Sequence, residues 1–269
     1  MIPHTEQRNE KSRHIDKMTS LEMVKVMNDE NRNSVDAVER VLPSVAKAVD
    51  IAAEAIANGG RVLYVGAGTS GRLGIIDATE CPPTFGADPS TFRGIIAGGK
   101  ERVFTAAEGE EDSYEAGVND VKDVLCSRDV AIGISAAGNA AYVLGALSKA
   151  REIGCRTISI VNNAGCKLES AADLCICCDT GAEVITGSTR LKAGNSQKFI
   201  LNMISTCSMI KTGKVYENLM INLRPTNIKL RARCIRITSE ILGTDEETAE
   251  KLLEKHSFNI RETVESEKR

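Results

Sequence analysis

The chain has 269 residues, with 34 Lys and Arg against 37 Asp and Glu, a formal net charge of −3 and 42% hydrophobic residues. This balance fits a globular protein with a sizeable core, and it offers neither the basic surface nor the aromatic stacking platform of a nucleic-acid-binding protein. Only three histidines occur, His4, His14 and His256, so the interior of the chain lacks an imidazole. Unless an end folds back, this argues against Ser-His-Asp or Cys-His catalysis and against histidine-based zinc sites.

The nine cysteines and the polar N-terminal residues indicate a cytoplasmic protein with reduced thiols and no signal peptide. Cys175, Cys177 and Cys178 lie in a short apolar run whose spacing matches no common zinc pattern, so we expect buried strand residues there. The uncharged stretch 130–148 is interrupted by Ser, Gly and Asn residues. It therefore predicts a strand, a loop and a helix, and no membrane partner is expected.

Residues 20–58 carry a helical pattern. Ser20 is expected to cap a first helix and Ser34 a second one, which Pro43 kinks or breaks. Residues 1–58 are therefore predicted to form an N-terminal helical extension.

Five short β-rich runs alternate with helical patterns after this extension. They are Arg61–Val65, Phe92–Ala97, Asp129–Ile134, Arg156–Val161 and Leu174–Asp179. Strands that alternate with helices predict an α/β fold whose five-stranded parallel sheet is covered on both faces. Ligands of such folds bind at the carboxyl ends of the strands. We expect this domain to span residues 59–214.

After residue 214 the strand signals fade and helical patterns follow, such as Asn227–Leu242. Thr244 and Glu247 form a capping-box pattern for a further helix. Residues 215–269 are therefore predicted to be a small C-terminal helical segment.

A glycine-rich loop follows the first strand and formally matches G-x-G-x-x-G. A dinucleotide site also requires an acidic residue at the end of the second strand. This chain has Ile96-Ala97-Gly98-Gly99 there, without an acidic residue. The loop instead carries Thr69 and Ser70 between Gly68 and Gly71, at a helix N-terminus that favours an anion. A phosphosugar fits this loop better than a dinucleotide, although a plain strand-to-helix turn is the simpler interpretation. The missing P-loop pattern argues against nucleotide hydrolysis.

A second hydroxyl-rich loop, Thr186 to Thr189, also precedes a helical pattern. Two such loops at one edge of a sheet favour a phosphosugar site, to which Ser188 and Thr189 would contribute.

Two glutamates are candidates for acid–base chemistry. Glu80 is expected at the C-terminal end of the helix that starts at the glycine loop, where the dipole and any burial would raise its pKa, as suits a general acid. Glu111 lies in the acidic run 108–113 before a helical pattern. The N-terminus of the predicted helix would keep a carboxylate ionised, which suits a general base. The alternative for Glu80 is a solvated residue at a helix end. The alternatives for the run 108–113 are an acidic helix start and a magnesium site.

Four motifs resemble a known family: GAGTSGRLGIIDATECPP, EEDSYEAGVND, TGSTRLKAG and an N-terminal pattern that begins with TEQRN. Over about residues 5–242 the chain resembles the N-acetylmuramic acid 6-phosphate etherases of the sugar isomerase (SIS) domain superfamily. The resemblance implies a three-layer αβα sandwich and cleavage of the D-lactyl ether of a phosphorylated amino sugar. It also implies catalytic roles for Glu80 as the acid and Glu111 as the base, a homodimer with the site near the interface, and no metal or other cofactor.

The loop after the third strand departs from this family, whose members read like ASGRTPYV there. This chain has AAGNAAYV, so Ala137 and Ala140 replace two hydroxyl residues that help to hold the phosphate, and Asn139 replaces an arginine. Ser135, Gly138 and Asn139 are still expected to contact the substrate. The C-terminal helical part is expected to be shorter than in the family.

The altered loop leaves open an alternative function, a catalytically weak or silent phosphosugar-binding regulator. An aldose–ketose isomerase, which starts with the same proton abstraction, and a dehydrogenase are further alternatives.

Overall fold

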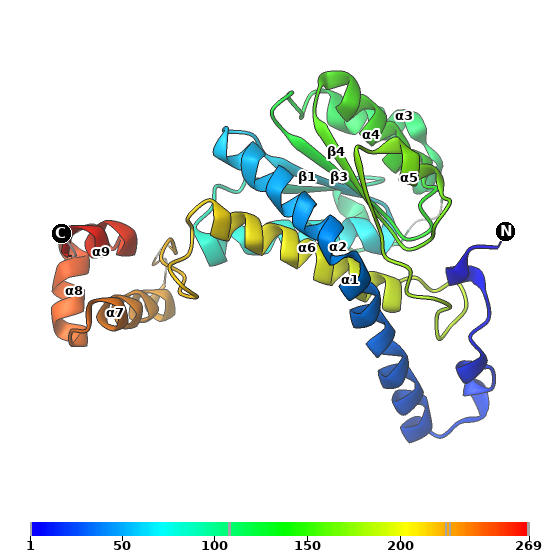
Figure 1. The fold of residues 1–269 in the computed structure, drawn as a ribbon, viewed down its shortest axis with the longest axis horizontal. Coiled ribbons are helices and arrows are strands. Elements are labelled where there is room, and N and C mark those ends of the chain that lie inside the picture. Colours follow the sequence, from blue (N-terminus) through cyan, green and yellow to red (C-terminus); the bar gives the residue numbers. More distant parts are fainter. Residues whose placement is uncertain (1, 107–108, 224, 226, 268–269) are drawn as a thin grey trace.

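The fold is an αβα sandwich with a helical unit attached at its C-terminal end (Figure 1). The computed structural model describes residues 2–106, 109–223, 225 and 227–267. Its single described sheet has five strands in the order β2-β1-β3-β4-β5, and every neighbouring pair is parallel. This confirms the predicted fold class. The domain boundaries at residues 58 and 214 remain predictions.

The predicted strands are all present, with ends shifted by at most two residues. They are β1 (Val62–Gly66), β2 (Phe92–Ile96), β3 (Val130–Ser135), β4 (Arg156–Val161) and β5 (Leu174–Cys177). The helices of the sandwich are α1 (Ser20–Ala57), α2 (Gly68–Phe85), α3 (Tyr114–Lys122), α4 (Ala141–Ile153), α5 (Lys167–Ala171) and α6 (Lys192–Lys211). In the described part of the C-terminal unit the helices are α7 (Ile228–Leu242), α8 (Glu246–Lys255) and α9 (Ile260–Glu267).

Both faces of the sheet are covered, which is why its strands are short apolar runs without a polar face. Alternate residues of β1 serve the two faces: Tyr64 packs in a core with α1, α2 and α6, whereas Leu63 and Val65 pack in a core with α3 and α4. Because the strands are parallel, their carboxyl ends meet at one edge, where the loops into α2 and α4 begin.

Helix α1 is one continuous helix of 38 residues, so the prediction of two helices is wrong. Thr19, not Ser20, caps it, in a capping box with Glu22. Ser34 is buried within the helix instead of starting a new one. Pro43 also lies inside it, on the exposed side, where water can bind the carbonyl that the missing N–H leaves free. Packing of α1 on α6 and the sheet outweighs the proline.

The N-terminal arm, residues 2–18, contains three short 3₁₀ turns and folds back along the segment 179–192. His4 Nδ1 lies 2.6 Å from Asp179 Oδ2 at the end of β5. An end of the chain therefore does fold back, and it brings the imidazole of His4 to the edge of the sheet.

A buried ion pair joins α1 to the start of α6. Lys192 Nζ donates to Glu30 at 2.6 Å, and both side chains are nearly inaccessible, at 2% and 4% exposure. Burial alone would raise the pKa of Glu30, but hydrogen bonds from Lys192, Lys11 and Asn9 lower that pKa to about 2.

Replacing Glu30 by Gln is expected to destabilise the protein by about 3–5 kcal/mol at pH 7, because a buried ammonium group loses its counter-charge. Since the folded-state pKa of Glu30 lies below its ordinary 4.5, the wild type should lose this stabilisation as the pH falls from 4.5 towards about 2. Urea unfolding at pH 7 and pH 3 measures both effects. The exposed pair Glu10–Arg13 supplies the control, Glu10→Gln, which should change little. A Glu30→Gln protein as stable as the wild type would contradict the prediction.

The C-terminal helices pack around a small core of their own, which includes Cys234, Ile237 and Leu253. The predicted helix after Asn227 is present, and the Asn227 side chain accepts a hydrogen bond from Leu230 N. The capping prediction for α8 is wrong, because Asp245 rather than Thr244 accepts from the helix N-terminus.

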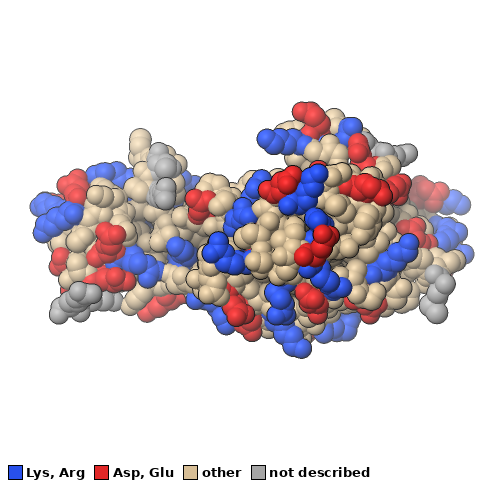
Figure 2. Space-filling model, turned by 90° about the horizontal axis from the view of Figure 1, so that it is seen from above, with Lys and Arg blue, Asp and Glu red and all other residues tan. Residues whose placement is uncertain are grey.

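All nine cysteines are free thiols. Cys178 is buried, Cys175 and Cys177 are half-buried, and burial raises the pKa of Cys177 to about 12, which keeps that thiol protonated. No helix in the described part of the chain is long and apolar enough to cross a membrane. On the face seen in Figure 2, acidic and basic side chains are intermixed.

Candidate active site

The order of the strands creates a crevice at the carboxyl edge of the sheet. β1 and β3 are neighbours, and the helices that follow them, α2 and α4, pack on opposite faces of the sheet. In parallel α/β sheets such a switch point is where ligands bind. The glycine loop after β1 and the loop after β3 lie at this point.

The glycine loop opens α2 without a side-chain cap. Ala67 is the N-cap residue and makes no side-chain hydrogen bond, so no side-chain cap occupies the first N–H groups of the helix. Gly68 has a φ of +51°, and a Cβ on Gly71 would lie 2.7 Å from the carbonyl oxygen of Gly66. The glycines therefore let the backbone turn tightly, and a helix N-terminus without a side-chain cap suits an anion.

Ser70 is engaged inside the protein. Its Oγ donates to Gln197 on α6 at 2.9 Å, and Gln197 donates in turn to Asn162 at 2.9 Å. Asn162 N donates to the carbonyl of Ala136 at 3.0 Å, in the loop after β3. This buried chain of polar groups fixes the two loops relative to each other. We predicted neither Gln197 nor Asn162, because no spacing marks three residues that lie so far apart in the sequence.

The loop after β3 is held by its own backbone and by a glycine. Ser135 Oγ accepts from Gly138 N at 3.1 Å, and Gly138 has a φ of +71°. A Cβ on Gly138 would lie 2.2 Å from Cys166 Sγ. Asn139 is exposed and accepts from Lys167 N at 3.1 Å. Ala140 caps α4 without a side-chain bond, so the start of this helix also presents open N–H groups.

Ala137→Ser combined with Ala140→Thr is expected to tighten phosphosugar binding by about tenfold or more, because each hydroxyl adds a hydrogen bond to a charged group. Calorimetric titration with a phosphosugar measures the affinity. Ala150→Ser, at a buried site on the far part of α4, is a control for added hydroxyls. Unchanged affinity of the double variant would mean that the phosphate does not sit at this loop.

The second hydroxyl-rich loop lies beside the first. A Cβ on Gly194 would be 3.4 Å from the Thr189 carbonyl oxygen and 3.6 Å from Thr69 Cγ2, so Thr69 and Thr189 are close neighbours. Ser188 is half-buried in the same turn. The structure thus brings together the predicted residues of both loops.

The N-terminus of α6 is already occupied by a carboxylate from the chain. Glu183 is fully buried, and its two oxygens accept from Lys192 N at 3.0 Å and from Ala193 N at 2.9 Å. Burial raises the pKa of Glu183, although these two donors oppose the rise. We did not predict this residue. Because it occupies the N-terminus of α6, the uncapped helix N-termini that remain at the crevice are those of α2 and α4.

Glu111 is exposed and lines a cavity of about 260 Å³ at the carboxyl edge, next to the glycine loop. It belongs to a 3₁₀ turn, Glu110–Asp112, that leads into α3, and the cavity also includes Gly68, Arg72 and Arg102. Arg102 forms an ion pair with the neighbouring Glu110 at 3.2 Å. Among the described residues nothing pairs with the carboxylate of Glu111. Glu108 of the acidic run lies outside the described residues.

Glu80 lies elsewhere, at the far end of α2. The helix does not stop at Glu80 but continues through Pro82 and Pro83 to Phe85, so the predicted helix end is wrong. Glu80 is exposed within one chain. It is twelve residues beyond Gly68, roughly 18 Å along the helix at 1.5 Å per residue. One chain therefore does not bring Glu80 and Glu111 together.

The cavity beside Glu80 has a volume of about 480 Å³ and contains further polar groups, among them Asp77, Lys198 and Ser205. Burial raises the pKa of Asp77, which accepts from Tyr64 at 2.9 Å and from Ser205 at 3.1 Å. Asp77 was not predicted, although it stands one helical turn before Glu80.

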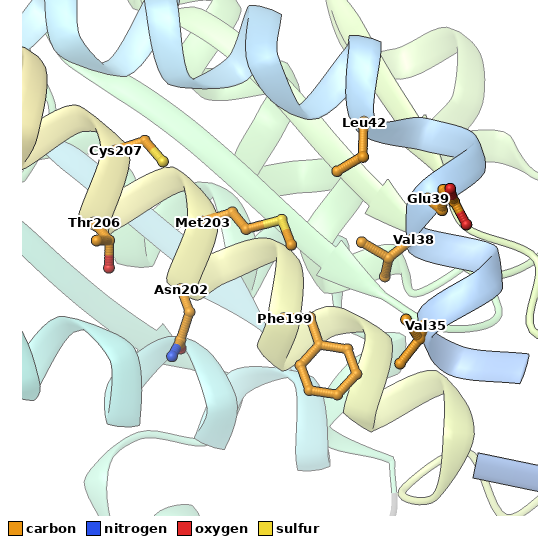
Figure 3. Close-up of a pocket in the computed structure, with 9 residues that line it drawn as sticks. All are labelled: Val35, Val38, Glu39, Leu42, Phe199, Asn202, Met203, Thr206 and Cys207. Atoms are coloured by element: carbon orange, nitrogen blue, oxygen red, sulfur yellow. The ribbon is translucent and has the colours of Figure 1, made fainter. Parts of the chain in front are cut away.

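An apolar groove of about 660 Å³ adjoins the Glu80 cavity, and both are lined by Asn202 and Thr206. Figure 3 shows Phe199 and Met203 of α6 facing Val35, Val38 and Leu42 of α1 across this groove. Val35 is 57% exposed and Leu42 is 42% exposed. Apolar side chains gathered in one exposed groove are typical of a surface that another molecule covers.

In the described part of the chain, no group of three or more His, Cys, Asp or Glu side chains is arranged to hold a metal ion. The magnesium interpretation of the acidic run therefore gains no support from the described residues.

The class of this fold is the SIS domain. Residues 107–207 match the SIS domain, and residues 44–151 match the glucokinase regulatory protein N-terminal SIS domain. Among solved structures, phosphoheptose isomerases from Francisella tularensis and Neisseria gonorrhoeae share the fold, with TM-scores of 0.55 and 0.52 at 17% and 18% identity. Each match covers 71% of this chain and 98% of the solved one.

Curated relatives show to which family the chain belongs. The N-acetylmuramic acid 6-phosphate etherase of Symbiobacterium thermophilum is 47% identical over 260 residues, which are 97% of this chain and 87% of the relative. The protein of the same name from Clostridium beijerinckii is 50% identical over 258 residues, 96% of this chain and 85% of the relative. The chain belongs to the N-acetylmuramic acid 6-phosphate etherase family.

Proposed function

We propose that this enzyme, a carbon–oxygen lyase, cleaves the D-lactyl ether of N-acetylmuramic acid 6-phosphate to N-acetylglucosamine 6-phosphate and D-lactate. The observation that carries the proposal is the position of Glu111, in a cavity beside the uncapped glycine loop at the switch point of the sheet. An anion-binding helix end and a carboxylate without a partner among the described residues are what a phosphorylated substrate with an acidic C–H bond requires.

The chemistry needs one base and one acid. In the open-chain sugar the proton on C2 is acidic because it is α to the aldehyde, and the lactyl ether oxygen is on C3. We assign Glu111 as the base that takes the C2 proton while the C3–O bond breaks, and Glu80 as the acid that protonates the departing lactate oxygen. Water then adds across the double bond at C3, and the C2 proton returns.

We infer that two copies of the chain form the working enzyme. Glu80 and Glu111 lie in separate cavities of one chain, and the apolar groove between α1 and α6 adjoins the Glu80 cavity. A second copy seated on this groove would cover its exposed side chains and carry its own Glu111 cavity towards Glu80. The homodimer thus accounts for both the exposed groove and the separated glutamates.

The remaining site residues fall into two groups. The α2 and α4 loops, with Gly68, Thr69, Gly71, Ser135 and Gly138, are proposed to hold the phosphate through backbone N–H groups and hydroxyls. Ser188, Thr189 and Asn139 are proposed to contact the sugar, while Ser70 shapes the loop through Gln197.

The test is release of D-lactate by the purified protein from N-acetylmuramic acid 6-phosphate, measured with a D-lactate dehydrogenase assay. Release well above that of the Glu80→Gln variant supports the function. No release above this variant contradicts it.

The second candidate, a phosphosugar-binding regulator, is favoured by the alanines at positions 137 and 140. In that case phosphosugars would raise the melting temperature without being consumed. D-lactate turnover at ordinary enzymatic rates excludes it.

The nine free thiols are in keeping with work in the reducing cytoplasm, which we propose as the location of the enzyme.

A further inference from the structure

Thr5 is fully buried, although its neighbours His4 and Glu6 are exposed. Its Oγ1 accepts a hydrogen bond from Asn163 Nδ2 at 3.0 Å, and its backbone N–H donates to Asn163 Oδ1 at 3.3 Å. A residue in a segment without regular helices or strands is usually solvated. The burial of Thr5 and its two bonds to a single asparagine therefore indicate a built contact.

Through these bonds Thr5 connects both loops of the crevice. Asn163 Nδ2 also donates to the carbonyl of Ala136 at 2.9 Å, at the start of the loop after β3. The carbonyl of Thr5 accepts from Gly187 N at 3.0 Å, in the second hydroxyl-rich loop. The backbone of Thr5 thus holds the loop that carries Ser188. The side chain of Thr5 holds the loop after β3 indirectly, through Asn163.

The rest of the N-terminal arm fixes the same segment further along. Ser12 Oγ donates to the Val184 carbonyl at 2.7 Å, and Asn9 Nδ2 donates to the Ala182 carbonyl at 3.1 Å. Glu6 lies directly over the loop, since a Cβ on Gly187 would meet its Oε2 at 2.8 Å. The segment before α6 has no regular secondary structure, so these contacts replace the hydrogen bonds of a helix or sheet.

We propose that the N-terminal arm is part of the phosphosugar site and that Thr5 is a positioning residue, which holds the loop after β3 and the Thr186–Thr189 loop in a fixed relative position. The inference rests on the proposed function for the identity of the ligand. The arm contributes before any substrate is present, by lowering the freedom of the two loops that must close on the phosphate and the sugar.

The experiment compares Thr5→Val, which keeps the shape and removes the hydroxyl, with Thr5→Ser, which keeps the hydroxyl. Thr238→Val is the matched control, because Thr238 is equally buried, lies in α7, and its Oγ1 has no hydrogen-bond partner among the described residues. Binding of N-acetylglucosamine 6-phosphate is measured by calorimetry, and hydrogen exchange is followed in the peptide that covers residues 182–189.

Thr5→Val is expected to weaken binding by about tenfold, because the Asn163 amide loses its buried acceptor. Exchange in the peptide 182–189 should become faster, while Thr5→Ser restores both properties and Thr238→Val changes neither. The rise in KM should exceed any fall in kcat, which general destabilisation would not produce.

Wild-type affinity and exchange in Thr5→Val would overturn the inference, as would equal losses in Thr5→Val and Thr238→Val. Thr5→Ala, which leaves room for a water, provides a second variant. If both variants unfold, Thr5 serves folding and the positioning role is refuted. If the wild-type protein releases D-lactate but the Thr5→Val variant binds the phosphosugar as tightly as the wild type, this inference alone is overturned. Thr5-dependent binding without D-lactate release would overturn the proposed function alone.

Discussion

Glu111→Gln and Glu80→Gln are each expected to lower the rate of D-lactate release by about 10²–10⁴-fold, the usual contribution of one acid or base. Glutamine keeps the shape of the side chain but cannot accept or deliver the proton. Binding of N-acetylglucosamine 6-phosphate should remain, because neither glutamate is assigned to the phosphate. Steady-state assays and calorimetry on the same preparations separate the two effects.

The matched control for this pair is Glu115→Gln, an exposed carboxylate in the first turn of α3, four residues beyond Glu111. It should retain wild-type activity, because it lines no part of the Glu111 cavity. Full activity of Glu111→Gln would remove this residue from the chemistry and leave the base unassigned.

Mixing the two inactive variants tests how the site is assembled. If Glu80 and Glu111 meet across a dimer, half of the randomly paired dimers hold one intact site, and activity should return to about a quarter of the wild-type level. If each site used the two glutamates of one chain, no activity would return on mixing. The distance along α2 favours the first outcome.

The second large effect is expected from a charge placed in the apolar groove. Phe199→Glu should give monomers, because burying a carboxylate without a partner costs more free energy than the contact between copies can offset. Release of D-lactate should fall by about 10²-fold or more. Sedimentation or light scattering reports the mass, and the D-lactate assay reports the activity.

Ile228→Glu is the control for this prediction, because Ile228 is 90% exposed at the start of α7 and lies outside the groove. It should remain dimeric and active. A Phe199→Glu protein that is dimeric and fully active would show that the groove between α1 and α6 is not the contact between copies.

The strands and the two hydroxyl-rich loops could be predicted because their signals are local. An apolar run such as 156–161 followed by a turn and a helical pattern marks a buried parallel strand without knowledge of its neighbours. The helix ends were harder to predict. Pro43 and Pro82 both lie inside helices, because packing of α1 and α2 on the sheet outweighs the local cost of a proline.

The residues that fix the site could not be predicted, because their partners are far away in sequence. Ser70 and Gln197 are 127 positions apart, and Thr5 and Asn163 are 158 positions apart. No periodic pattern encodes such pairs. Glu183 shows the same limit, since no local pattern marks it as the carboxylate that accepts from Lys192 N and Ala193 N at the start of α6.

The folded-back N-terminal arm also governs how the protein can be handled. His4 and Thr5 lie at the edge of the sheet next to the loops proposed to bind the substrate, so a purification tag fused before them would emerge beside these loops. The C-terminal helices stand apart from the sandwich (Figure 1). Asn222, in the segment that leads to these helices, donates to the Phe85 carbonyl at the end of α2, so an immobilisation chemistry directed at them would act far from the glycine loop at the start of α2.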